Sequence, residues 1–183
     1  LMFTCSTFHH SVIDARKAEL GIESLYTFYH PIHVNFHQLF IGWKTAEGTY
    51  HGSTLALELL WEELTKSMKK WDTKIQNVYD DSTARYKILF PIGRSGFNRL
   101  EYDQRLAALE SFIAAIGDDA DEDMREVKTL ASELLARIAA ARSLQAGKKS
   151  LKENLAGQVD IARLACAEGL YRNQGELMKL FYQ

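Results

Sequence analysis

Three histidines have a spacing that could bind a metal ion. His33 and His37 lie four residues apart, and His30 precedes His33 by three. Residues at these separations share one face of a helix, as the imidazole ligands of a metal site do. No carboxylate or cysteine lies at ligand spacing beside them, since the nearest acidic residues are Glu23 and Glu47. The alternative is that these histidines border the apolar face and hydrogen-bond to neighbours, so we expect no bound cofactor.

A second candidate is an anion-binding site at Arg94, Arg99 and Arg105. The segment 93–96, Gly-Arg-Ser-Gly, could cradle a phosphate with its backbone N–H groups. It lacks the Gly-x-Ser-x-Gly order of a nucleophile elbow, and a glycine-permitted turn between helices is the simpler interpretation. The sequence also lacks Glu-x-x-His, which di-iron helical bundles place on two helices. We therefore predict no catalytic residue and interpret the protein as non-enzymatic.

Composition and charge exclude several classes of protein. The chain has 183 residues, 46% of them apolar and 25% charged, with a net charge of −2. This balance is typical of a globular protein and predicts neither nucleic-acid binding nor membrane insertion. The two cysteines, Cys5 and Cys166, cannot form a disulfide framework, and we interpret Cys166 as a small buried residue. No signal peptide is visible in the given residues, so we expect a cytoplasmic protein.

The spacing of apolar residues predicts an all-α fold. The sequence has only two prolines and no strand-type alternation. We expect an antiparallel bundle of about five to six helices in a single domain, residues 1–183, with an irregular connector at 80–99. Long helices are predicted near 22–46, 53–79, 121–146 and 150–182, and shorter ones near 7–19 and 100–116.

Glycines and capping residues define the predicted helix ends. Residues 48–52 begin and end with glycine and indicate a turn, followed by Ser53 as an N-cap. Gly147 predicts another helix end, and residues 150–153 match a capping box. The acidic run at 118–123 favours the positive end of a helix dipole and predicts a helix start.

Two strings in the middle of the chain support a resemblance. They are residues 70–79 (Lys-Trp-Asp-Thr-Lys-Ile-Gln-Asn-Val-Tyr) and 86–97 (Tyr-Lys-Ile-Leu-Phe-Pro-Ile-Gly-Arg-Ser-Gly-Phe), with 142–147 downstream. The chain resembles a group of uncharacterised bacterial all-helical proteins, in which a Trp-Asp…Ile-Gln-Asn-Val-Tyr helix end precedes a Phe-Pro-x-Gly-Arg loop. The likeness covers roughly residues 40–183. It implies a helical fold and no known activity, and residues 95–96 depart from the group's pattern.

The last predicted helix carries more apolar surface than one bundle contact needs. One seam includes Val159, Ala162 and Cys166, and a second seam lies roughly opposite. Such a helix either lies inside the core or presents an interface. We favour the interface, and we predict a structural or interaction protein that assembles with itself. The predicted interface residues are Leu164, Tyr171, Met178, Tyr182, Leu55 and Leu59. The alternative function is a bundle that binds a small ligand or a metal ion through His30, His33 and His37.

Overall fold

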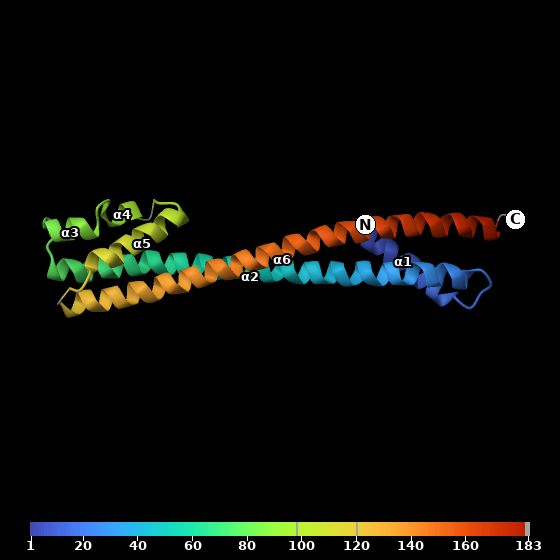
Figure 1. Ribbon diagram of the computed structural model, residues 1–183, viewed down its shortest axis with the longest axis horizontal. Helices are drawn as coiled ribbons and strands as arrows, with labels where there is room; N and C mark the ends of the chain where they lie inside the picture. The colour runs from blue at the N-terminus through green and yellow to red at the C-terminus, as the bar shows by residue number, and fades with distance from the viewer. Residues whose placement is uncertain (98, 120, 182–183) are drawn as a thin grey trace. The chain divides into compact units, whose positions relative to one another are not determined.

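The protein is entirely helical in the part that the structure describes. This computed structural model describes residues 1–97, 99–119 and 121–181, and these residues form helices without strands. The helices of this described part are α1 (Met2–Ala15), α2 (Ile22–Val78), α3 (Ala84–Leu89), α4 (Gly93–Phe97), α5 (Tyr102–Ile116) and α6 (Glu122–Phe181) (Figure 1). The predicted all-α bundle is therefore confirmed.

Two pairs of predicted helices are single helices in the structure. The helices expected at 22–46 and 53–79 are one helix, α2, and those expected at 121–146 and 150–182 are one helix, α6. The predicted ends at 48–52 and at Gly147 are wrong. None of these glycines has a positive φ, and a helical glycine costs only about 1 kcal/mol relative to alanine. Packing along the helix offsets a cost of that size.

The shorter elements agree better with the sequence. Gly117 has φ +61 and ends α5, as its position predicts. The side chain of Asp121 accepts hydrogen bonds from the backbone N–H groups of Asp123 and Met124, so the acidic run does start a helix. The first helix lies at Met2–Ala15 instead of 7–19, and the predicted irregular connector contains α3 and α4.

The chain divides into two compact units. Unit 1 comprises Leu1–His51 with the described part of Gly147–Gln183, and unit 2 comprises Gly52–Ala146. Both α2 and α6 contribute to each unit, and each unit has its own core. That the whole chain folds as a single domain stays a prediction from the sequence.

In unit 1, large side chains of α2 pack on small residues of α6. A Cβ atom added to Gly169 would lie 3.0 Å from the ring of Tyr29, so glycine allows this close contact. Phe36 shares a buried cluster with Ala162 and Cys166. Residue numbers therefore rise along α2 as they fall along α6, and the two helices are antiparallel. Helix α1 lies beside them and adds Ile13 to the core (Figure 1).

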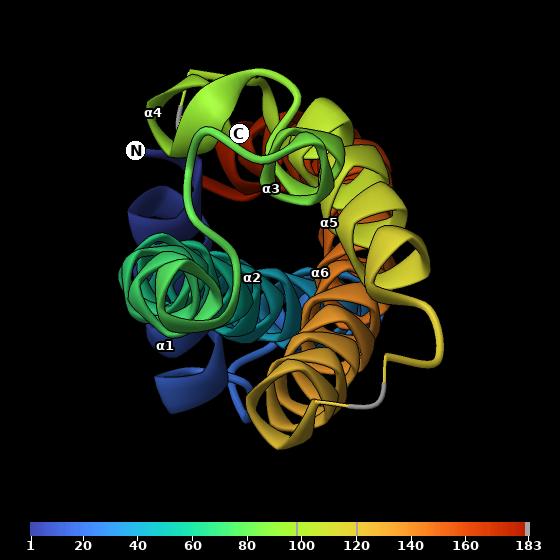
Figure 2. The same cartoon turned by 90° about the vertical axis from the view of Figure 1, so that its left-hand side faces the viewer.

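In unit 2, α2, α3, α4, α5 and α6 all contribute buried residues to the larger core. Trp61, Leu64, Met68, Trp71 and Ile75 form the buried stripe of α2, as the sequence predicts. Ion pairs join the antiparallel helices α2 and α6, with Glu63 and Arg137 2.7 Å apart. Helix α3 lies beside α5, and both lie across the core from α2 (Figure 2).

Replacing Gly52 with alanine tests the continuity of α2. Nothing lies within 4 Å of a Cβ atom at Gly52, and its φ is not positive. We expect Gly52→Ala to raise the free energy of unfolding by about 0.5–1 kcal/mol, because alanine loses less conformational entropy than glycine in a helix. Urea denaturation followed by circular dichroism measures this change.

The matched control is Gly117→Ala, which places a Cβ atom at φ +61. It should lower the free energy of unfolding by about 1 kcal/mol, because alanine disfavours a left-handed backbone. A similar loss for Gly52→Ala would contradict a continuous helix and restore the turn.

Candidate functional site

The histidines of unit 1 gather where α1 packs against α2. Nε2 of His10 lies 2.8 Å from Nδ1 of His30, and the ring of His10 stacks on that of His33 with centroids 4.2 Å apart. The rings of His33 and His37 are 5.8 Å apart. The predicted trio is thus joined by His10, which sequence reasoning missed. The spacing of residues within one helix cannot reveal His10, because its contacts with His30 and His33 depend on how α1 packs against α2.

A buried chain of hydrogen bonds fixes His33. The hydroxyl of Tyr29 donates to Oγ of Ser6 at 2.8 Å, and Oγ of Ser6 lies 2.9 Å from Nδ1 of His33. A serine hydroxyl carries one proton and two lone pairs, so Ser6 can accept from Tyr29 and also donate to Nδ1 when that nitrogen is unprotonated. Burial, together with smaller contributions from the neighbouring His10, His37 and His30, lowers the pKa of His33 to about 4.

The same cluster ties α6 to α1. Sγ of Cys166 lies 3.6 Å from Oγ of Ser6, and both residues are fully buried. Burial raises the pKa of the Cys166 thiol, as expected for an inert structural cysteine. Nδ2 of Asn173 lies 3.1 Å from Nε2 of His9 and donates to the carbonyl of Leu25. The polar cluster therefore holds three helices together and has no exposed nucleophile.

The metal interpretation gains no support from this geometry. His30 and His33 each use Nδ1 for a neighbour on α1. Within residues 1–97, 99–119 and 121–181, no group of three His, Cys, Asp or Glu side chains is arranged to hold a metal ion. The structure instead agrees with the alternative of histidines that hydrogen-bond to neighbours at the edge of the apolar face.

The candidate anion-binding arginines have separate roles in unit 2. Arg94 lies 3.5 Å from Asp72, a buried carboxylate that also accepts a 2.6 Å hydrogen bond from the hydroxyl of Tyr86. These contacts fasten α3 and α4 to α2. Arg105 donates to the carbonyl of Leu100. The backbone of Arg99 donates to Gly96 within the turn.

Unit 2 contains an apolar cavity of about 180 Å³. It lies between the α3–α4 segment and α5, and Phe90, Phe97 and Phe112 contribute to its wall. Among the described residues that line it, Ser111 has the only polar side chain. Substrate sites typically place several polar groups around an apolar pocket, so this cavity lacks the convergence that chemistry needs.

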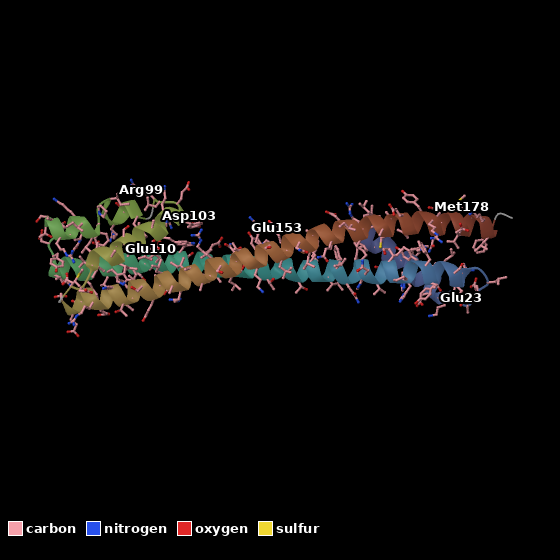
Figure 3. The ribbon with its side chains drawn as sticks, viewed as in Figure 1. Glu23, Arg99, Asp103, Glu110, Glu153 and Met178 are labelled. Atoms are coloured by element: carbon pink, nitrogen blue, oxygen red, sulfur yellow. The ribbon has the colours of Figure 1, made fainter. Side chains whose placement is uncertain are left out.

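The outer side of α6 in unit 1 presents the predicted second seam. Tyr171 is 76% exposed, Leu164 60% and Met178 55%, and Met178 lies near the C-terminal end of the helix (Figure 3). Ile161, 71% exposed, extends the seam by one turn and was missed by the sequence analysis. The predicted interface residue Tyr182 lies outside the described residues. These side chains, which we call the outer seam, are surface rather than core.

Leu55 and Leu59 are also exposed, each on α2 within unit 2. They lie one helical turn apart and point away from the buried stripe, as predicted. They belong to a different unit from the outer seam, so each surface is described by itself. No described helix is sufficiently long and apolar to cross a bilayer. No family model, curated protein or solved structure matches this chain.

The buried histidine makes unit 1 sensitive to acid. The pKa of His33 is about 4 in the folded chain and 6.5 when unperturbed, so the unfolded chain binds the proton first as the pH falls. Stability is therefore complete above pH 6.5 and declines between pH 6.5 and pH 4. Each pKa unit is worth about 1.4 kcal/mol, which gives a loss of at most about 3 kcal/mol. Urea denaturation at pH 7 and pH 4.5 measures it.

His33→Asn is the matched variant, because the asparagine amide keeps a polar atom near Ser6 but does not titrate. Its stability should fall less over the same pH interval than that of the wild type. Equal losses in both proteins would show that other groups cause the acid sensitivity.

Proposed function

We propose that this chain is a non-enzymatic structural or interaction protein that assembles with itself through the outer seam of α6. The observation that carries this proposal is a row of large, exposed apolar residues along one face of α6. The inner face of α6 packs into unit 1 through small residues, among them Ala162 and Gly169, and through the larger Val159, Leu170 and Leu177. Large apolar residues lie on the opposite, exposed face. Exposed apolar residues that line up along one helix face are typical of an interaction surface.

The energetics favour covering the seam. Burying one large apolar side chain contributes roughly 1.5–3 kcal/mol, and two copies bring eight such side chains together. Even at half burial the sum is roughly 6–12 kcal/mol, comparable to the cost of about 4–15 kcal/mol for association. The aromatic ring of Tyr171 and the flexible side chain of Met178 are residue types enriched at interfaces. Burial of the outer seam therefore offsets a cost of association within this range.

The polar cluster supports a structural role better than a catalytic one. Ser6 and Cys166 are fully buried, and their hydrogen bonds join α1, α2 and α6. Hydrogen bonds within a buried polar cluster favour one arrangement of packed helices, and in this cluster Oδ1 of Asn173 is left without a partner among the described residues. We assign the cluster the task of holding α1 on the helix pair, which keeps the inner face of α6 covered and its outer seam presented.

Tyr171→Glu tests the proposed assembly. A charge at the centre of the seam cannot be buried without a partner, and we expect the dissociation constant to rise at least about 30-fold. Light scattering at about 100 μM should give the wild type a mass above the 20.8 kDa of one chain, and the variant that of one chain. Circular dichroism should show the same helix content in both.

Ile41→Glu is the matched control, because Ile41 is an exposed apolar residue of unit 1 on a different helix. This variant should retain the mass of the wild type. A wild-type mass of one chain at 100 μM would refute self-assembly. Loss of helix content in Tyr171→Glu would show that the seam is core, which also contradicts the proposal.

A further inference from the structure

Two further residues, Glu168 and Gly175, lie between the four residues of the outer seam, and neither is large and apolar. Both are exposed on the same side of α6 as the other four. The six positions alternate at steps of three and four, which is the heptad pattern of a coiled coil. In heptad notation the a positions are Ile161, Glu168 and Gly175, and the d positions are Leu164, Tyr171 and Met178.

A parallel pair of these helices would place identical residues against each other. Glu168 would face Glu168, which brings two carboxylates together at the centre of an apolar seam. Gly175 would face Gly175, which leaves a void where a side chain should pack. Both consequences disfavour the parallel arrangement.

We infer that two copies pair through antiparallel α6 helices centred between Gly169 and Leu170; this inference rests on the proposed self-assembly. In an antiparallel pair each a position faces a d position of the second copy. Glu168 then faces Tyr171, whose hydroxyl can donate a hydrogen bond to the carboxylate. The facing pairs are Ile161 with Met178, Leu164 with Gly175, and Glu168 with Tyr171, each occurring twice.

Packing agrees with this register along the whole seam. Leu164 fills the space that Gly175 of the second copy leaves open, so a large residue meets a small one. The flanks repeat the pattern, because Ala165 faces Arg172 and Ala167 faces Gln174. The guanidinium of Arg172 lies 3.8 Å from the centre of the Phe28 ring, which holds it beside the seam. Arg172 is the residue after Tyr171, and Tyr171 faces Glu168 of the second copy. The positive charge of Arg172 therefore lies next to that carboxylate.

The antiparallel register also indicates that the partner bound at the outer seam is a second copy of this chain. A twofold axis brings the same surface of both chains together, so each complementary pair is satisfied twice and the assembly closes as a dimer. Glu168 and Gly175 are unfavourable in a seam that meets only apolar side chains, yet each has a fitting counterpart in this sequence. A different protein would have to supply both counterparts in the same register.

Disulfide crosslinking distinguishes the two directions of pairing. Cys5 is exposed and Cys166 is buried, so the experiment uses the full chain with Cys5→Ser. Two further variants carry either Ile161→Cys or Met178→Cys in this background. In the antiparallel pair the two 161 positions are about 25 Å apart along the axis, from 17 residues at about 1.5 Å each. A disulfide needs Cα atoms about 4.4–6.8 Å apart, so neither variant should crosslink with itself.

An equimolar mixture of the two variants should form disulfide dimers under mild oxidation, at least about tenfold more than either variant alone. Mass spectrometry of the crosslinked peptide should identify a bond between positions 161 and 178. Crosslinking of Ile161→Cys alone would show a parallel pair and overturn this inference while leaving self-assembly intact. A dimer that forms no crosslink in the mixture would place the interface elsewhere and overturn it too. A monomeric wild type refutes the proposed function itself.

Glu168→Gln provides a second measurement that does not need a cysteine at the seam. In the antiparallel pair the amide oxygen introduced by this substitution still accepts a hydrogen bond from Tyr171. The dissociation constant should therefore stay within about threefold of the wild-type value or rise. In a parallel pair the substitution removes repulsion between two carboxylates, and the dimer should tighten by about tenfold or more. Analytical ultracentrifugation of the wild type and the variant measures the difference, and tightening would contradict the antiparallel register.

Discussion

The antiparallel pairing of α2 with α6 is the interaction on which the rest of each unit depends. In unit 1 the pairing matches large residues of α2, such as Tyr29 and Phe36, with small residues of α6, such as Ala162 and Gly169. This match lets the two backbones approach closely and bury a continuous stripe. It also has a consequence for the outside of the molecule. The inner face of α6 is filled by contacts with α1 and α2, so the exposed Leu164, Tyr171 and Met178 lie on a second, outer face.

Polar contacts then fix the helices that pack on this pair. In unit 1 the chain from Tyr29 through Ser6 to His33 positions α1, and burial lowers the pKa of His33 and so favours its neutral imidazole. In unit 2, Asp72 accepts a hydrogen bond from Tyr86 and forms an ion pair with Arg94. These two contacts fasten the segment that contains α3 and α4 to α2. Buried hydrogen bonds specify one arrangement where apolar packing alone allows several. The residues whose types suggested chemistry therefore serve to fix the fold.

Apolar periodicity predicted the helical class, the buried stripe of α2 in unit 2, and the exposure of the second seam of α6. Glycines that commonly end helices led to wrong predictions of a helix end at two places. Gly48, Gly52 and Gly147 resemble stops, yet each lies inside a helix whose flanks are held by partners, and tertiary packing outweighs a cost of about 1 kcal/mol. At Gly117 the φ is positive and the same residue type does end a helix. The contacts of His10 with α2 depend on how α1 docks, which spacing within one helix cannot show.

The central claim is that the outer seam of α6 becomes covered when copies of the chain meet. Hydrogen–deuterium exchange of the unmodified protein at about 1 μM and about 100 μM tests it directly, since association slows exchange where helix opening is suppressed. The account predicts slower exchange at the higher concentration for peptides covering residues 160–181, and unchanged exchange for peptides covering α5. Identical exchange of residues 160–181 at both concentrations would contradict it.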